Sequence, residues 1–151
     1  MAAPYVRFRL QYPEALSQHL TQLRSYWVSS QPLGVKIGEF LRRYVHGFDP
    51  AYWFLPNSSD LIRHQMKGMG HMRLISLPFV LLGLIAALRR LKDPSWRVVL
   101  IALLTAPAGA ALVDVAITRL LVMLLPLCYL ALLGMEQLLS LIHISEPTRP
   151  Y

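Results

Sequence analysis

The amino-acid sequence predicts an all-α membrane protein, with amphipathic interfacial helices in an extracytoplasmic loop region (1–72) followed by three transmembrane helices. The first observation is composition: 55% of the 151 residues are hydrophobic and mean hydropathy is +0.44, which is high for a soluble domain of this length. The second is segregation, because the C-terminal half contains three apolar runs without a charged residue. The third is charge: the net charge is +7, and of the fifteen Lys and Arg residues nine precede Leu74 and four lie between the first two apolar runs, where lipid headgroups would favour them.

The N-terminal third predicts two amphipathic helices after an extended or irregular start at residues 1–12. Residues 13–29 place four large apolar side chains at helical spacing, and residues 35–45 do the same with a cationic side of Lys36, Arg42 and Arg43. Two interpretations stay open. The helices either lie on a membrane surface or pack as ordinary helices on a soluble domain.

An aromatic loop connects these helices to the apolar runs. Tyr52, Trp53 and Phe54 suit the headgroup level of a bilayer, but they equally suit a plug in the loop's own small core. Residues 57–60 then form either a turn or a helix cap, with Ser59 or Asp60 as the predicted N-cap.

The three apolar runs predict transmembrane helices at about 73–89, 97–113 and 119–138. Each run falls short of the ~20 residues that cross a bilayer comfortably, and flanking arginines that snorkel extend them. A soluble three-helix bundle is disfavoured, because the helices are apolar on every face. The last two form an antiparallel hairpin, and the internal prolines, Pro78, Pro107 and Pro126, are tolerated as kinks.

Loop charges predict the orientation. Four cations lie between the first two spans in the segment 89–97, whereas only Arg119 lies between the last two. The positive-inside rule therefore places the first loop in the cytoplasm and residues 1–72 outside it, in a multi-pass inner or plasma membrane protein. Nucleic-acid binding is not expected, since no basic helix or groove motif accompanies the charge. The single cysteine, Cys128, excludes an intrachain disulfide.

The candidate binding residues are Arg63, His64 and Lys67, which span one helical turn and can share a face. At the outer membrane surface they suit an anionic headgroup or a lipid-linked phosphate. Gly68 and Gly70 allow a positive φ or a close backbone approach. A loop attracted to any anionic lipid explains the same pattern equally well.

A weaker hypothesis is a copper(I) site. Thioether and imidazole ligands suit this soft ion, and one loop has three methionines spaced by three and interleaved with two histidines, namely Met66, Met69, Met72, His64 and His71. Apolar anchoring of the methionines at the interface is the alternative, and no acidic or cysteine ligand joins them. No metal ligand is therefore assigned.

Three segments, FLRRYVHGFDPAYWF, RHQMKGMG and LPFVLLGL, resemble a region of bacterial membrane glycosyltransferase family 39. These GT-C enzymes are similar to protein O-mannosyltransferases and aminoarabinose transferases. The resemblance covers about residues 37–135. The matching positions are Phe48, Pro50, Tyr52, Phe54, Arg63, His64, Gly68, Gly70, Leu77, Pro78, Leu82, Gly83 and Leu84. The family tends to have Gly-Asp just before Arg-His; here Asp60 is shifted, and no role is carried over to it.

The resemblance implies a fragment of a polytopic GT-C enzyme that moves a sugar from a polyprenyl-phosphate carrier to an extracytoplasmic acceptor. The family's acidic catalytic residue lies in an earlier loop, so no catalytic residue is assigned here. Arg63, His64 and Lys67 remain candidate contacts to the carrier phosphate. No cofactor is expected on these residues, although a divalent metal is possible in the parent protein. The alternative is a small non-enzymatic membrane anchor or assembly protein; oligomeric state is open.

The tail has a different origin in this interpretation. Residues 139–149 read LSLIHISEPTR, which resembles the in-frame translation of a transposase-type sequencing adapter over eleven codons. Residues 139–151 are therefore expected to be read-through rather than native sequence, and His143, Ser145 and Glu146 are assigned no chemistry.

Overall fold

The computed structural model describes residues 3–144, which contain helices and no strand. The α-helices are α1 (Ala3–Gln11), α2 (Ala15–Gln22), α3 (Leu33–His46), α4 (Pro50–Phe54), α5 (Leu77–Arg89), α6 (Pro94–Ala111) and α7 (Ile117–Ile144). Three short 3-10 helices lie between them, at Tyr26–Val28 (η1), Ile62–His64 (η2) and Leu74–Ser76 (η3). The predicted all-α class is thus confirmed. Of the expected read-through segment, residues 145–151 lie outside the described residues.

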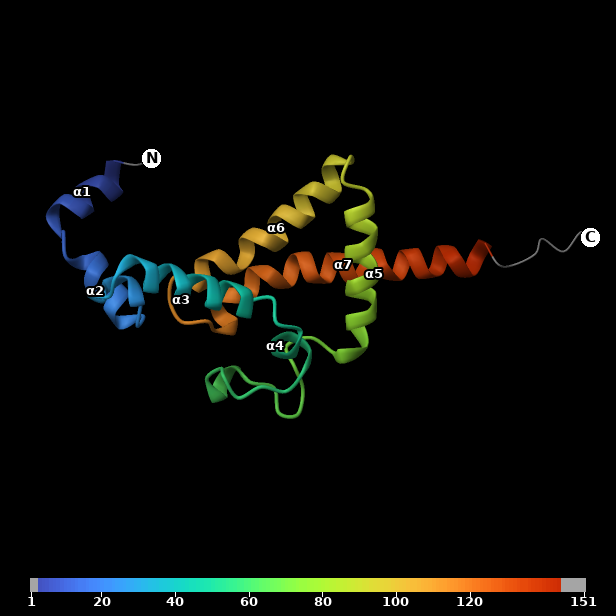
Figure 1. The fold of residues 1–151 in the computed structure, drawn as a ribbon, viewed down its shortest axis with the longest axis horizontal. Helices are drawn as coiled ribbons and strands as arrows, with labels where there is room; N and C mark the ends of the chain where they lie inside the picture. The colour runs from blue at the N-terminus through green and yellow to red at the C-terminus, as the bar shows by residue number, and fades with distance from the viewer. Residues whose placement is uncertain (1–2, 145–151) are drawn as a thin grey trace, which may run out of the picture.

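Two helices have the length and composition to cross a membrane, Pro94–Ala111 and Ile117–Ser140. The chain reverses between them and α7 returns against α6 (Figure 1). The third predicted span is shorter: η3 and α5 have 3 and 13 residues, about 24 Å at ~1.5 Å per residue, against ~30 Å of hydrocarbon. Figure 1 shows α5 running across α7 rather than alongside it. The third span therefore stays a prediction.

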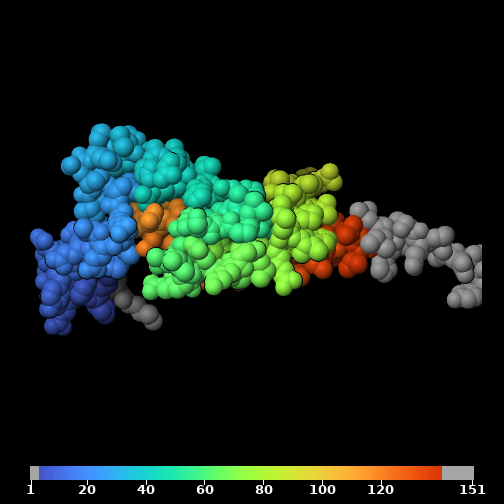
Figure 2. All heavy atoms as spheres, turned by 90° about the horizontal axis from the view of Figure 1, so that it is seen from below, coloured from blue at the N-terminus to red at the C-terminus, as the bar shows by residue number. Residues whose placement is uncertain are grey.

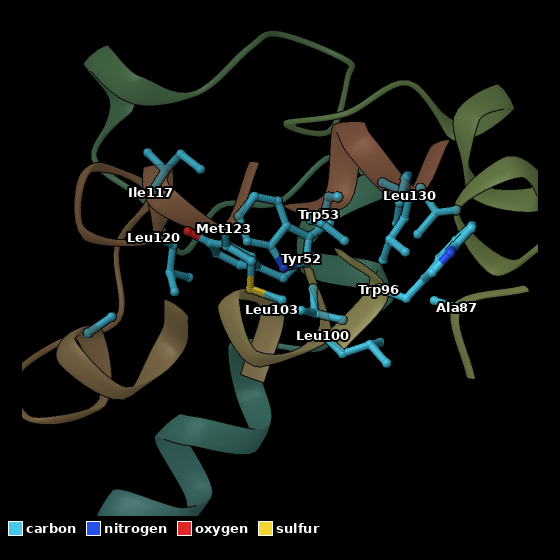
Figure 3. Packing of buried hydrophobic residues seen from close by; sticks show 14 of the residues in the cluster. Tyr52, Trp53, Ala87, Trp96, Leu100, Leu103, Ile117, Leu120, Met123 and Leu130 are labelled. Atoms are coloured by element: carbon cyan, nitrogen blue, oxygen red, sulfur yellow. The ribbon is translucent and has the colours of Figure 1, made fainter. Parts of the chain in front are cut away.

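The crossing of α5 and α7 depends on two glycines that face each other. A Cβ added to Gly134 would lie 3.0 Å from the backbone nitrogen of Gly83 and would collide with the carbonyl oxygen of Phe79. A Cβ on Gly83 would collide with the carbonyl oxygen of Leu130. Small residues allow helix backbones to approach closely, which is how helices associate in lipid. Leu130 itself is fully buried in this contact (Figure 3).

The N-terminal region differs from the expectation in two places. Residues 3–11, expected to be irregular, form α1. The helix expected at 13–29 ends at Gln22, because Arg24 adopts a positive φ of 54°, and a separate 3-10 turn follows. A left-handed residue cannot continue a right-handed helix. The helix expected at 35–45 is confirmed as α3.

α3 exposes an aliphatic side that a helix packed on a water-soluble core would bury. Its aliphatic side chains at every fourth position, Leu33, Ile37, Leu41 and Val45, are 47–65% exposed. Arg43 is the polar side chain that faces the protein: it is 15% exposed and its Nε lies 2.6 Å from a Glu39 carboxylate oxygen, whereas the Arg42 side chain is 67% exposed. An outward aliphatic stripe is the arrangement expected where the surrounding medium is lipid or a partner.

The polar face of α3 and the preceding turn satisfy the carbonyl groups at the end of α6. Ser25 Oγ and Tyr26 Oη each donate to a carbonyl of residues 111–112 at 2.8 Å, and the Arg43 guanidinium donates to the carbonyl of residue 113. The last carbonyls of a helix lack partners within the helix. These three side chains therefore fasten the N-terminal region to the turn between α6 and α7.

Candidate functional site

The segment between α4 and α5, residues 55–73, forms a closed loop that returns to α4. It turns at Gly68, whose φ is +74°, and comes back so that the Met72 N–H donates to the Trp53 carbonyl at 2.8 Å. A Cβ on Gly70 would lie 2.5 Å from the carbonyl carbon of Phe54, so only glycine fits at this crossing. Both glycine roles considered from the sequence are present, and the space-filling view shows this green region lying across the middle of the molecule (Figure 2).

The aromatic helix α4 is the buried floor of this loop. Tyr52, Trp53 and Phe54 are 3%, 1% and 5% exposed, and the Trp53 indole N–H donates to the Gly47 carbonyl at 2.8 Å. Tyr52 and Trp53 belong to the apolar cluster that also includes Leu103 and other residues of α5, α6 and α7 (Figure 3). The structure thus favours the plug over the headgroup interpretation of these rings.

Asp60 lies at the centre of a buried polar cluster. Its side chain is 1% exposed. One carboxylate oxygen, Oδ1, accepts from the Ile117 N–H at 2.8 Å and from the Tyr52 hydroxyl at 3.3 Å. The other, Oδ2, pairs with His71 Nε2 at 2.9 Å. The carboxylate therefore joins α4, the returning segment of the loop and the first residue of α7.

Residues 58–60 bend, in agreement with the turn alternative, whereas the N-cap alternative is wrong in its location. η2 begins after Leu61 and has no side-chain cap, whereas Asp60 caps α7, 57 positions later in the chain. The first N–H groups of a helix lack partners within it, and a negative charge is favourable at this end of the helix dipole. A buried carboxylate is therefore well placed here. Sequence spacing carried no signal for this contact.

The polar groups around Asp60 are hydrogen-bonded to it or to one another, and its charge contributes to the raised pKa of one of them. Burial, and then the Asp60 carboxylate, raise the pKa of the Tyr52 phenol well above its usual range, so the phenol remains a donor. The Asn57 amide nitrogen donates to the Tyr52 carbonyl at 3.1 Å and lies 3.3 Å from His71 Nε2. The Gln65 amide donates to the Asp60 carbonyl. Each of these groups has a partner, so the cluster acts as a clasp that holds the loop on α7.

The three candidate binding residues lie on the outer part of this loop. Arg63 and His64 belong to η2, but η2 ends at His64, so the expectation that Lys67 shares one helical turn with them is wrong. Arg63 and Lys67 are exposed and His64 is partly buried. Within residues 3–144, the Arg63 and Lys67 side chains make no hydrogen bond or ion pair. The loop thus presents two cations that no acidic residue neutralises.

The residues considered for a copper(I) site lie in different surroundings. His71 is engaged with Asp60, and Met72 packs against the apolar core, whereas Met66 and Met69 are exposed. Over the described part of the chain, no three His, Cys, Asp or Glu residues gather where they would hold a metal ion.

No family model, curated protein or solved structure matches this chain. The glycosyltransferase resemblance therefore rests on the short motifs quoted above.

Proposed function

We propose that this chain is a membrane-embedded part of a glycosyltransferase that moves a sugar from a polyprenyl-phosphate carrier to an extracytoplasmic acceptor, and that it is inactive alone. The observation that carries the proposal is the loop of residues 55–73. It is fastened to α7 through Asp60, and it leaves Arg63 and Lys67 unpaired. The motif resemblance supports the same assignment.

The membrane placement follows from the apolar helices. α6 and α7 cross the bilayer, and η3 with α5 forms a third, shorter membrane segment. The cation-rich turn between α5 and α6 faces the cytoplasm, and residues 1–72 lie on the other side. α3 lies in the interface with its aliphatic stripe toward the lipid, because its polar side is already occupied by the end of α6.

Arg63 and Lys67 then act as contacts to the phosphate of the lipid carrier. A guanidinium and an ammonium pair with phosphate oxygens through charge-assisted hydrogen bonds. Such contacts strengthen as negative charge develops on a departing phosphate. His64 lies beside Arg63 on η2 and can donate to the same group. Asp60 and His71 are positioning residues, since they hold the loop and do not contact the carrier.

The test is binding of undecaprenyl phosphate to the purified chain in phosphatidylcholine nanodiscs. Arg63→Gln and Lys67→Gln should each weaken binding roughly tenfold, because each removes a hydrogen bond between charged groups. Arg7→Gln is the matched control: Arg7 is an exposed arginine on α1, outside the loop. Equal affinity of the two loop variants and the control would reject the phosphate role.

The glycosyltransferase assignment needs a separate test, the genomic sequence upstream in the same frame. It should encode further apolar helices and a loop with an acidic residue; their absence ends the assignment. The second candidate, a non-enzymatic membrane anchor or assembly protein, is favoured by one observation: every member of the Asp60 cluster is satisfied internally. A ribosome-binding site directly before Met1 would support it.

A further inference from the structure

α5 and α6 diverge from their shared turn (Figure 1). Side chains of both helices line an apolar pocket there, here called the wedge. The wedge has a volume of about 550 Å³, within the ~300–1,000 Å³ typical of ligand pockets. Leucines of both helices line it, with Ile101 on α6 and Phe48 at the junction of α3 and α4. Arg97, on the first turns of α6, is its single charged residue.

The turn at the wedge carries an unneutralised positive charge. Residues 89–97 contain four cations and one carboxylate, a net charge of +3. The carboxylate, Asp93, is occupied as the N-cap of α6, accepting from the Ser95 N–H at 2.9 Å. The Arg90 guanidinium lies 5.4 Å from the centre of the Trp96 ring. Within the described residues, the side chains of Arg89, Lys92 and Arg97 make no hydrogen bond or ion pair.

We infer that this wedge binds one anionic glycerophospholipid, with an acyl chain between α5 and α6 and the headgroup phosphate against Arg97. The apolar lining matches a hydrocarbon chain, and the cations of the turn match the phosphate. The aliphatic stem of an arginine packs along apolar surface while its guanidinium reaches the headgroup level. The N-terminus of α6 adds the positive end of a helix dipole at the same place.

The occupant is a phospholipid rather than the isoprenoid carrier because of where the turn lies. The inference rests on the membrane placement in the proposed function, which puts this turn on the cytoplasmic side. Anionic phospholipids at that surface attract basic segments next to membrane helices. The carrier phosphate, in contrast, is assigned to the loop of residues 55–73 on the opposite side. The two sites therefore differ in ligand, in residues and in membrane face.

The experiment is lipid retention, measured by native mass spectrometry after reconstitution in vesicles of equal phosphatidylglycerol and phosphatidylcholine and release into mild detergent. One phosphatidylglycerol should remain bound per chain. Arg97→Gln should lower its retention roughly tenfold, as expected for the loss of a charge-assisted contact. Ile101→Trp should remove it by filling the wedge, and since Ile101 is 59% exposed this change leaves the core intact. Arg119→Gln, in the first turn of α7, is the matched control and should have no effect.

Three results would overturn the inference. They are equal retention of the two phospholipids, unchanged retention in both Arg97→Gln and Ile101→Trp, and displacement of phosphatidylglycerol by added undecaprenyl phosphate. The first two leave the carrier assignment untouched, because that depends on Arg63→Gln. Conversely, the Arg63→Gln variant should retain phosphatidylglycerol whether or not its binding of the carrier is weakened. One proposal can therefore fail while the other stands.

Discussion

Replacement of Asp60 is the most direct test of how the loop is held. Asp60→Ala leaves the Ile117 N–H, the Tyr52 hydroxyl and the His71 ring without their shared acceptor. A hydrogen bond to a charged group contributes about 1.5–3 kcal/mol, and such contributions do not simply add. Removing one partner of a buried pair costs about 3–5 kcal/mol. We therefore expect Asp60→Ala to lower the free energy of unfolding by about 3–5 kcal/mol, on the basis of these ranges.

Asp60→Asn separates charge from shape. The amide keeps an oxygen that accepts from the Ile117 N–H but loses the negative charge beside His71 and at the start of α7. Its expected cost is smaller, about 1–3 kcal/mol. Asp114→Asn is the control, because that carboxylate is 65% exposed and lies 3.7 Å from its arginine partner; it should change stability by less than about 0.5 kcal/mol.

The assay is urea unfolding in detergent micelles followed by circular dichroism, with hydrogen exchange at the Ile117 amide as a local readout. Exchange there should accelerate in Asp60→Ala before global unfolding. A double-mutant cycle with His71→Ala should give a coupling of at least about 1 kcal/mol. A loss below about 0.5 kcal/mol in Asp60→Ala, or strictly additive losses in the cycle, would refute the clasp.

Three further predictions concern other parts of the fold. Hydrogen bonds from two neighbouring arginines, Arg42 first, lower the pKa of Glu39 from 4.5 to about 2. Its contribution to stability is therefore complete above about pH 4.5 and is lost as pH falls through about 2; in thermal melts, Glu39→Gln should flatten the pH dependence in that window, and parallel curves would disprove it. Gly83→Ala should destabilise the chain by about 1–3 kcal/mol through collision with α7, whereas Gly109→Ala, with open space around its Cβ, should not; equal melting temperatures would contradict the close crossing. Burial and the Asp60 carboxylate raise the pKa of Tyr52 well above its usual range, so its phenol stays protonated in the folded chain at pH values where an unfolded tyrosine, with a pKa of about 10, ionises; if Tyr52→Phe reduces the 295 nm absorbance change of the folded protein at pH values where exposed tyrosines ionise, the buried contact is wrong.

Local patterns in the sequence were sufficient to predict some of the helices. Apolar runs and helical spacing predicted α3 and α6 within about three residues at each end, because these signals act over one or two turns. They also predicted the start of α7, but this helix continues to Ile144, beyond the expected end at residue 138. They were insufficient for α1 and for the helix expected at 13–29, where one left-handed residue, Arg24, ends the helix. The glycine roles at 68 and 70 were also visible, since a positive φ and a tight crossing both demand a missing side chain.

By itself, then, the sequence determined that the chain is helical, that its C-terminal half is apolar enough for a membrane, and which loop carries cations. Only the tertiary structure decided what Asp60 does, because its partners at Tyr52, His71 and Ile117 come from three segments that no local period connects. It also turned the aliphatic side of α3 outward, since Arg43 is needed at the end of α6. The physical reason is the same in both cases: a backbone group at a helix end must find a partner, and the partner is chosen by proximity in space rather than in sequence.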